Sequence, residues 1–252
     1  MRNAISRRLA SIQPGQLRFR RHPCPLCRQT RLFVRLANDE TGVRCLHCRA
    51  TPVTLSLVSV LLESQPDLAQ KSVYELSSRG ALFAFLQRNA GSVTGSEYFA
   101  DLAPGAWQGS IQCQDVQALT HPSGSFDICT STEVFEHVPD DHRGFAEVCR
   151  VLRPGGRLVF TVPIDVHGRT IERARLSAGG DIEHLLTPEY HGDPVGNAGR
   201  ILAFRNYGAD IVDRLLASGF DSADLRMPDH PAPWNYGRAV VVACKAARTG
   251  KA

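Results

Sequence analysis

The chain has 252 residues, of which 43% are hydrophobic and 21% are charged, a composition typical of a globular protein rather than a disordered one. Its longest apolar run, residues 53–62, is far shorter than the roughly 20 residues that a membrane-spanning helix needs. No apolar stretch of the kind found in secretory signals follows the basic start. We therefore expect neither membrane insertion nor secretion, and we expect a cytoplasmic location.

The charge is distributed unevenly along the chain. Residues 1–50 carry eleven arginines and two acidic residues, a net charge of +9, whereas residues 51–252 carry a net charge of −5. A basic head on an acidic body is typical of a protein with an anionic partner, such as nucleic acid, phosphate or a membrane surface. A solvated basic tail has the same composition.

Four cysteines near the start have the spacing of a metal site. Cys24, Cys27, Cys45 and Cys48 form a C-x2-C-x17-C-x2-C pattern, which predicts a structural Zn²⁺ held by four thiolates. The alternatives are two disulfides, which a reducing compartment disfavours, or a knuckle without metal. Between the two cysteine pairs, the alternation at residues 31–36 and the turn residues at 38–42 predict a hairpin. We expect a basic arm at residues 1–21 and a zinc-ribbon-like element at residues 22–50.

The rest of the chain, residues 51–252, alternates between strand and helix patterns. Thr51 and Pro52 predict the start of a helix that ends near Gln65. Strands are predicted at residues 72–76, 92–97, 110–114, 126–130, 157–162, 221–226 and 239–246, helices at 81–89, 141–151 and 209–218, and a turn at 153–156. This alternation predicts an α/β domain with a doubly wound, mostly parallel sheet.

Acidic residues follow four successive predicted strands. Glu75, Glu97, Asp115 and Glu133 occupy these positions, and open parallel sheets bind ligands at the carboxyl ends of their strands. A carboxylate after the second strand accepts hydrogen bonds from both hydroxyls of a ribose, and Asp115 can accept one from an adenine amino group. Gly80 provides the tight turn after the first strand. This pattern predicts a nucleoside site.

Residues 73–162 resemble the class I S-adenosylmethionine-dependent methyltransferases, in the group that includes the ubiquinone- and menaquinone-type enzymes. The resemblance is carried by the segments Ser125–Cys129, Glu133–Asp140 and Glu147–Phe160, which match the family's fourth strand, the following helix and the fifth strand. It implies a Rossmann-like sheet of seven strands, S-adenosylmethionine as cofactor and methyl transfer as the reaction.

The resemblance also implies the residues that would bind the cofactor. The family's Gly-x-Gly-x-Gly turn is altered here, with Ser77, Arg79 and Ala81 at the glycine positions, so Ser hydroxyls and Arg79 would bind the carboxylate of the methionine moiety. Glu97 would bind the ribose, Asp115 and Val116 would surround the adenine, and residues 131–133 would line the methyl side. The full set is Glu75, Ser77, Ser78, Arg79, Gly80, Glu97, Tyr98, Asp115, Val116, Ser131, Thr132 and Glu133.

The segment between the fifth strand and the last helix, residues 164–208, is long and rich in polar residues. Loops of this length are usually lids or binding loops, and in the family the acceptor is often enclosed at this point. An oxygen or nitrogen acceptor can require a base, for which His191 and His184 in this insert and His137 after the fourth strand are the candidates.

Three functions are consistent with these features. We rank first a methyltransferase that acts on an oxygen or nitrogen atom of a small-molecule, sugar-linked or lipid-linked acceptor. An RNA methyltransferase that holds its substrate with the basic zinc ribbon comes second. A non-catalytic module that binds a cofactor or a partner comes third, because the first glycine motif is altered.

Overall fold

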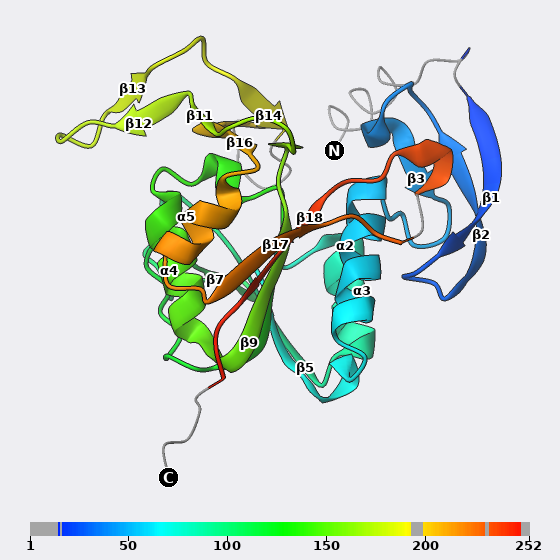
Figure 1. The fold of residues 1–252 in the computed structure, drawn as a ribbon, viewed down its shortest axis with the longest axis horizontal. Helices are drawn as coiled ribbons and strands as arrows, with labels where there is room; N and C mark the ends of the chain where they lie inside the picture. Colours follow the sequence, from blue (N-terminus) through cyan, green and yellow to red (C-terminus); the bar gives the residue numbers. More distant parts are fainter. Residues whose placement is uncertain (1–14, 16, 193–198, 230–231, 248–252) are drawn as a thin grey trace.

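The computed structural model describes residues 15, 17–192, 199–229 and 232–247. At its centre lies an eight-stranded sheet with the order β17-β18-β9-β8-β4-β5-β7-β6 (Figure 1). In that order the strands are Ser222–Arg226, Val240–Cys244, Leu152–Thr161, Phe126–Thr132, Ser72–Glu75, Ser92–Glu97, Ile111–Cys113 and Trp107–Gln108. The five strands from β9 to β7 are parallel, while β17, β18 and β6 run antiparallel to their neighbours. The prediction of a mostly parallel sheet is thus confirmed.

Two details of the sheet differ from the prediction. The expected number of strands was seven, and the eighth is β6, which forms because Gly109, at a φ of 63°, allows a tight turn that pairs Gln108 with Ile111. Residues 153–156 are part of β9 rather than a separate turn. A register shift in the pairing with β8 accommodates these residues within β9.

Helices cover both faces of the sheet. Helices α2 (Pro52–Ser64) and α3 (Gly80–Asn89) pack on one face, and α4 (Asp141–Val151) and α5 (Ile211–Ala217) pack on the other (Figure 1). The alternation of side chains along each strand divides the core accordingly, since Val159 of β9 faces α2 whereas Leu158 and Phe160 face α4. Short 3-10 helices are η2 (Glu40–Gly42), η3 (Leu68–Gln70), η4 (Phe135–His137) and η5 (Pro233–Asn235).

The N-terminal segment forms a three-stranded antiparallel sheet, which we call the cysteine ribbon and define as residues 17–50. Its strands are β1 (Arg18–Cys24), β2 (Gln29–Arg35) and β3 (Val43–Cys45). Residues 18–21 were expected in the basic arm, but they pair with β2. The rest of that arm, residues 1–14 and 16, lies outside the described residues. Phe33, Val43 and Cys45 of the ribbon are buried in the same core as α2 and α3, so the ribbon and the sheet share one hydrophobic core.

The insert at residues 164–208 folds into short paired strands. Its strands are β10 (Ile164–Asp165), β11 (Ile171–Glu172), β12 (Ala174–Leu176), β13 (Ile182–His184), β14 (Tyr190–Gly192), β15 (Arg200–Leu202) and β16 (Arg205–Gly208). The pair β12–β13 projects from one end of the molecule, whereas β16 pairs with both β10 and β11 (Figure 1). Residues 193–198 of the insert lie outside the described part. None of the helices in the described ranges has the length and apolar character that a membrane-spanning helix needs.

Candidate functional site at the carboxyl edge of the sheet

The turn after β4 folds onto Glu97 at the end of β5. Oε1 of Glu97 accepts hydrogen bonds from the Ser77 hydroxyl at 3.1 Å, from the Ser78 amide and hydroxyl at 2.9 Å each, and from Nε of Arg79 at 3.1 Å. All four bonds use the same oxygen, and within the described residues Oε2 of Glu97 accepts none. Glu97 is thus a buried carboxylate with one oxygen held by the turn and one available to a ligand.

Gly80 gives this turn its shape. Its φ of 89° lies in the left-handed region that favours glycine, and a β-carbon at this position would meet nothing within 4 Å. The space beside Gly80, at the first turn of α3, is therefore open.

Glu75, the acidic residue at the end of β4, lies deeper than the sequence indicated. Its side chain is 2% exposed and accepts a hydrogen bond from the hydroxyl of Thr130 on β8. Burial raises the pKa of Glu75 to about 8, so the carboxyl group is mostly protonated at neutral pH. Glu75 joins two strands beneath the site and does not line the cavity described next.

A cavity of about 350 Å³ lies at the carboxyl ends of β4, β5 and β7. Four of the predicted cofactor-binding residues line it, namely Glu97, Tyr98, Asp115 and Val116, and so does the predicted base His137. The insert contributes an apolar wall made of Ile182, Ile201, Leu202 and Phe204. A volume of this order is typical of small-molecule sites.

The residues at the end of β8 lie outside this cavity. Ser131 is fully buried, and Thr132 is half-buried. Glu133 has a φ of 55° and forms an ion pair with Arg238, which also pairs with Glu40 of the cysteine ribbon. Residues 131–133 are thus not among those that line the described cavity, and the Glu133 side chain is engaged by Arg238.

Two histidines predicted as bases lie together beside a buried carboxylate. The rings of His137 and His191 are 4.9 Å apart, and Oε1 of Glu136 is 3.6 Å from Nε2 of His137 and 3.6 Å from Nδ1 of His191. Nδ1 of His137 lies 2.8 Å from the Leu202 carbonyl, which can only accept, so this nitrogen carries a proton. Nε2 of His191 is 3.2 Å from Glu189.

The electrostatics of this cluster favour a proton shared between Glu136 and His191. Burial raises the pKa of Glu136 to about 7, while the contact with Glu136 raises the pKa of His191 against the opposing effect of burial. One carboxylate and two imidazoles, with ligand atoms within 4.8 Å of one another, could also hold a divalent metal ion. Neither Glu136 nor Glu189 was predicted from the sequence as a site residue.

His184, the remaining predicted base, is not part of the cluster. It is exposed on β13, in the projecting pair of strands, opposite Ala174 of β12. The β14–β15 pairing brings His191 toward Glu136, and no comparable pairing does so for His184, so the structure places His191 but not His184 in the cluster.

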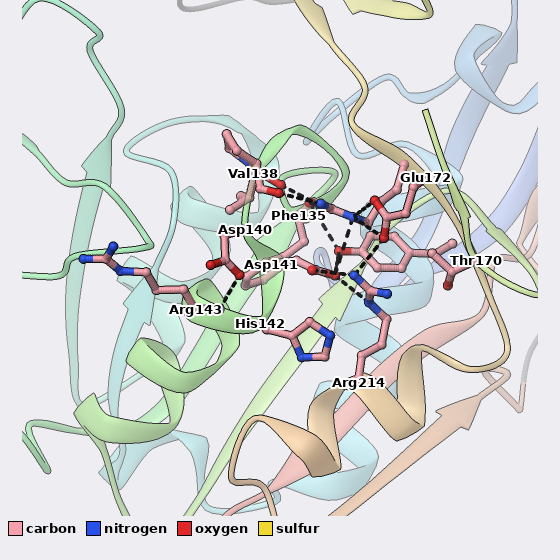
Figure 2. A network of polar contacts seen from close by, with 12 residues as sticks. Phe135, Val138, Asp140, Asp141, His142, Arg143, Thr170, Glu172 and Arg214 are labelled. Atoms are coloured by element: carbon pink, nitrogen blue, oxygen red, sulfur yellow. Dashed lines mark hydrogen bonds and ion pairs between the residues drawn. The ribbon is translucent and has the colours of Figure 1, made fainter. Parts of the chain in front are cut away.

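A buried network of charges fixes η4, which carries Glu136 and His137. Arg205 of β16 is 3% exposed and donates to the carbonyls of Phe135, Val138 and Pro139 at 3.2, 2.5 and 2.7 Å. Figure 2 shows how Asp141 and Glu172 converge on Arg214, whose Nη2 lies 2.6 and 2.9 Å from them. The network ties the insert and α5 to the segment that follows β8.

The four cysteines of the ribbon converge as their spacing predicted. Their sulfur atoms all lie within 4.8 Å of one another, and all four thiols are free. The Sγ atoms of Cys24 and Cys48 are 3.6 Å apart, much longer than the roughly 2.05 Å of a disulfide bond. Tetrahedral Zn²⁺ with bonds of about 2.3 Å requires sulfur separations of about 3.8 Å. The donor set therefore fits Zn²⁺ and contradicts the disulfide alternative.

Comparisons with known proteins agree with the geometry of the sheet edge. Residues 77–160 match the family model described as "Methyltransferase domain". A ubiquinone biosynthesis O-methyltransferase from Coxiella burnetii is 36% identical over 133 residues, which are 49% of this chain and 55% of that protein. An uncharacterized methyltransferase from Mycobacterium avium is 34% identical over 104 residues, 40% of this chain and 38% of that one.

Among solved structures, an S-adenosylmethionine-dependent methyltransferase from Mesorhizobium loti is similar with a TM-score of 0.45 and 18% identity, over 74% of this chain and 96% of that one. The present chain spans about half, 55%, of the length of the Coxiella burnetii protein that it matches. The matched segment, residues 77–160, contains Glu97, Asp115, Val116 and His137 of the described cavity.

Proposed function

We propose that the chain binds S-adenosylmethionine at the carboxyl edge of its sheet and transfers the methyl group to an oxygen of a small molecule with an apolar body. The observation that carries this proposal is Glu97, a buried carboxylate at the floor of the cavity with Oε2 available, within a segment that matches the methyltransferase domain family. The named O-methyltransferase relative supports oxygen as the acceptor atom.

The adenosine part of the cofactor would lie in the described cavity. Oε2 of Glu97 can accept from the ribose hydroxyls, while Tyr98 and Val116 offer apolar surface to the adenine. Oδ1 of Asp115 accepts from the Gln117 amide at 2.8 Å, which holds the carboxylate in place to accept from the adenine amino group.

The methionine part would lie over the turn at Ser77–Gly80. The side chain of Arg79 is 46% exposed and pairs with Glu97 through a single nitrogen, Nε. Its remaining guanidinium nitrogens can bind the carboxylate of the amino acid, a role for which the planar fork of arginine is suited. This arrangement offers a substitute for the backbone contacts of the glycine-rich turn that the chain lacks.

In methyl transfer the main task of the protein is to position the reactants. When bound, S-adenosylmethionine supplies an electrophilic methyl group on a sulfonium whose departure leaves a neutral thioether. The protein must hold the acceptor oxygen in line and remove its proton. The base is drawn from the pair formed by His137, which lines the cavity, and His191, whose ring lies beside it. Glu136 lies 3.6 Å from a nitrogen of each ring and stabilises the imidazolium that forms.

The wall formed by the insert supports an acceptor with an apolar body. Ile182, Ile201, Leu202 and Phe204 face the same cavity as His137, so an acceptor there would have its hydroxyl near polar groups and the rest of its surface on apolar side chains. For the ribbon, we propose a structural Zn²⁺ held by Cys24, Cys27, Cys45 and Cys48, as the convergence of their thiols supports.

The test begins with cofactor binding. Isothermal titration calorimetry of the wild-type protein should show binding of S-adenosylmethionine, and no binding at millimolar cofactor would overturn the proposal. Labelled cofactor and a fractionated cell extract then identify the acceptor by the labelled fraction. With that acceptor, His191→Asn should lower turnover by about 100-fold in buffer containing EDTA, whereas His184→Asn should leave it unchanged. If the wild-type protein loses turnover in EDTA while circular dichroism shows that it stays folded, the cluster would instead be assigned to a metal ion.

A further inference from the structure

The turn after β7 holds the side chain of Gln117 between a carboxylate and a backbone amide. Nε2 of Gln117 lies 3.2 Å from Oδ1 and 3.4 Å from Oδ2 of Asp115, and Oε1 of Gln117 accepts from the Asp140 amide at 3.0 Å. A backbone amide only donates and an ionised carboxylate only accepts, so these two partners fix which way round the side-chain amide lies. Gln117 therefore presents its NH₂ group to Asp115.

The main chain of Gln117 is held at the same point. Its amide donates to Oδ1 of Asp115 at 2.8 Å, and its carbonyl accepts from Nε of Arg143 at 2.8 Å. Asp140 caps α4, and Arg143 lies in the first turn of that helix (Figure 2). The turn that carries Asp115 is thus fastened to the start of α4 by two separate hydrogen bonds.

These contacts leave Asp115 with one oxygen for a ligand. Oδ1 accepts two hydrogen bonds from Gln117, whereas within the described residues Oδ2 has only the long contact of 3.4 Å. Both Asp115 and Gln117 line the cavity at the sheet edge. If only the backbone amide held Oδ1, the carboxylate plane could turn about that single bond, because the terminal torsion of Asp has broad minima. The side chain of Gln117 therefore fixes the direction in which Oδ2 points.

The direction of this oxygen decides which purine the cavity accepts. The 6-amino group of adenine donates hydrogen bonds, whereas the 6-oxo oxygen that replaces it in hypoxanthine only accepts them. A carboxylate oxygen fixed at this position binds the amino group and repels the oxo group, although the two bases have nearly the same size. A site built to bind an N–H group rejects the analogue that lacks it more strongly than an apolar pocket can.

We propose that Gln117 is a positioning residue that makes the cofactor site select adenine over hypoxanthine by holding Asp115. The inference rests on the proposed function, because it requires the adenosine part of S-adenosylmethionine to lie in the cavity. Leu76 and Val116 line the same cavity and offer the same apolar contact to either base. The selection therefore comes from the pair formed by Asp115 and Gln117.

Isothermal titration calorimetry tests this role by comparing the affinities of the protein for S-adenosylhomocysteine and for its deaminated analogue, S-inosylhomocysteine. We expect the wild-type protein to bind the adenine compound at least about 30-fold more tightly. Gln117→Met keeps the length of the side chain but removes its donor and its acceptor, and it should lower this ratio at least about 5-fold. A residue that only held the loop in place would weaken both compounds alike and leave the ratio unchanged.

A second variant separates the two ends of the side chain. Gln117→Glu keeps an oxygen for the Asp140 amide but places a second carboxylate beside Asp115, and the two carboxylates repel each other. We expect it to lower the ratio of affinities at least as much as Gln117→Met. The matched control is Gln112→Met, because Gln112 is a half-buried glutamine on β7 that donates to the Gly105 carbonyl at 3.2 Å and does not line the cavity. The control should change the ratio by less than about twofold.

Circular dichroism verifies that each variant is folded. Should either Gln117 variant not fold, Gln117→Asn takes its place, because its shorter side chain cannot reach both partners. A ratio within about twofold of the wild-type value for the Gln117 variants, or an equal loss in Gln112→Met, would overturn the role of Gln117 and leave the cofactor site intact. Equal binding of the two compounds by the wild-type protein would overturn it as well. Wild-type protein that binds neither compound would overturn the proposed cofactor site, and this inference with it.

Discussion

Replacing Asp141 by Asn tests whether the buried charge network holds the segment after β8 in place. The Asp141 carboxylate is 1% exposed and accepts from Nε and Nη2 of Arg214 at 2.8 and 2.6 Å and from the Tyr207 hydroxyl at 2.8 Å. It also lies 3.7 Å from Nε of Arg205. With Glu172 the network contains two anions and two cations, so it is neutral as a whole.

The substitution Asp141→Asn leaves one buried positive charge without compensation. Removal of one partner from a buried ion pair costs about 3–5 kcal/mol, whereas an exposed pair contributes less than about 1 kcal/mol. Asn keeps the shape and one acceptor oxygen, and Glu172 still contacts both arginines. We therefore expect the lower end of that range, a loss of about 3 kcal/mol in the free energy of unfolding.

Urea denaturation followed by circular dichroism measures this loss. Asp140→Asn is a matched control, because Asp140 is the exposed neighbour whose side chain caps α4 by accepting from the Arg143 amide at 3.0 Å (Figure 2). Asn is as good a cap as Asp, so the control should lose less than about 0.5 kcal/mol. A loss below about 1 kcal/mol for Asp141→Asn would refute the view that the network is a rigid support.

The same network predicts a pH dependence. Burial alone would raise the pKa of Asp141, but the hydrogen bond from Arg214 and the charges of Arg205 and Arg214 outweigh burial and lower it. A carboxyl group whose pKa is lowered on folding stabilises the folded state above its unfolded pKa of about 3.9, and this contribution is lost as the pH falls toward the folded value. The difference in the free energy of unfolding between wild type and Asp141→Asn should therefore be constant at neutral pH and shrink below about pH 4.

Three further outcomes are expected. Protein purified without chelator should contain about one Zn²⁺ per chain, as metal analysis can check. The Cys27→Ser variant should lose this Zn²⁺. Calorimetry should then show a lower melting temperature with a single transition for the whole domain, because ribbon and sheet share a core. Glu97→Ala should weaken S-adenosylmethionine binding by about 2 kcal/mol, and Glu97→Gln, which keeps one acceptor, should weaken it less. An affinity of Glu97→Ala equal to that of the wild-type protein would contradict the assigned role. Arg238→Met should destabilise the fold by about 2 kcal/mol because it leaves Glu40 and Glu133 unpaired, while Arg226→Met, at an exposed pair with Asp224, should cost less than about 0.5 kcal/mol in urea denaturation.

Local signals in the sequence determined most strands of the central sheet and the helices that cover it. The helix predicted at residues 141–151 has the same bounds in the structure, because an Asp cap and an apolar stripe act within a few residues of each other. The strand predicted at residues 92–97 also has the same bounds. The four cysteines and the carboxylate after the second strand could be predicted for the same reason. The cysteines are recognised by their spacing along the chain, and the carboxylate by its place directly after a strand.

Contacts between distant segments could be decided only by the tertiary structure. Glu136 and His191 are separated by 55 positions, and they meet because β14 pairs with β15 and Arg205 of the adjoining β16 anchors η4. No periodicity distinguishes His191 from His184, which the same insert leaves exposed to solvent. The engagement of Glu133 by Arg238, 105 positions later, likewise depends on how the last strand enters the sheet. Spacing along the chain determines which side chains meet within one turn. Side chains far apart in the sequence converge only when strand pairing and burial bring their elements together.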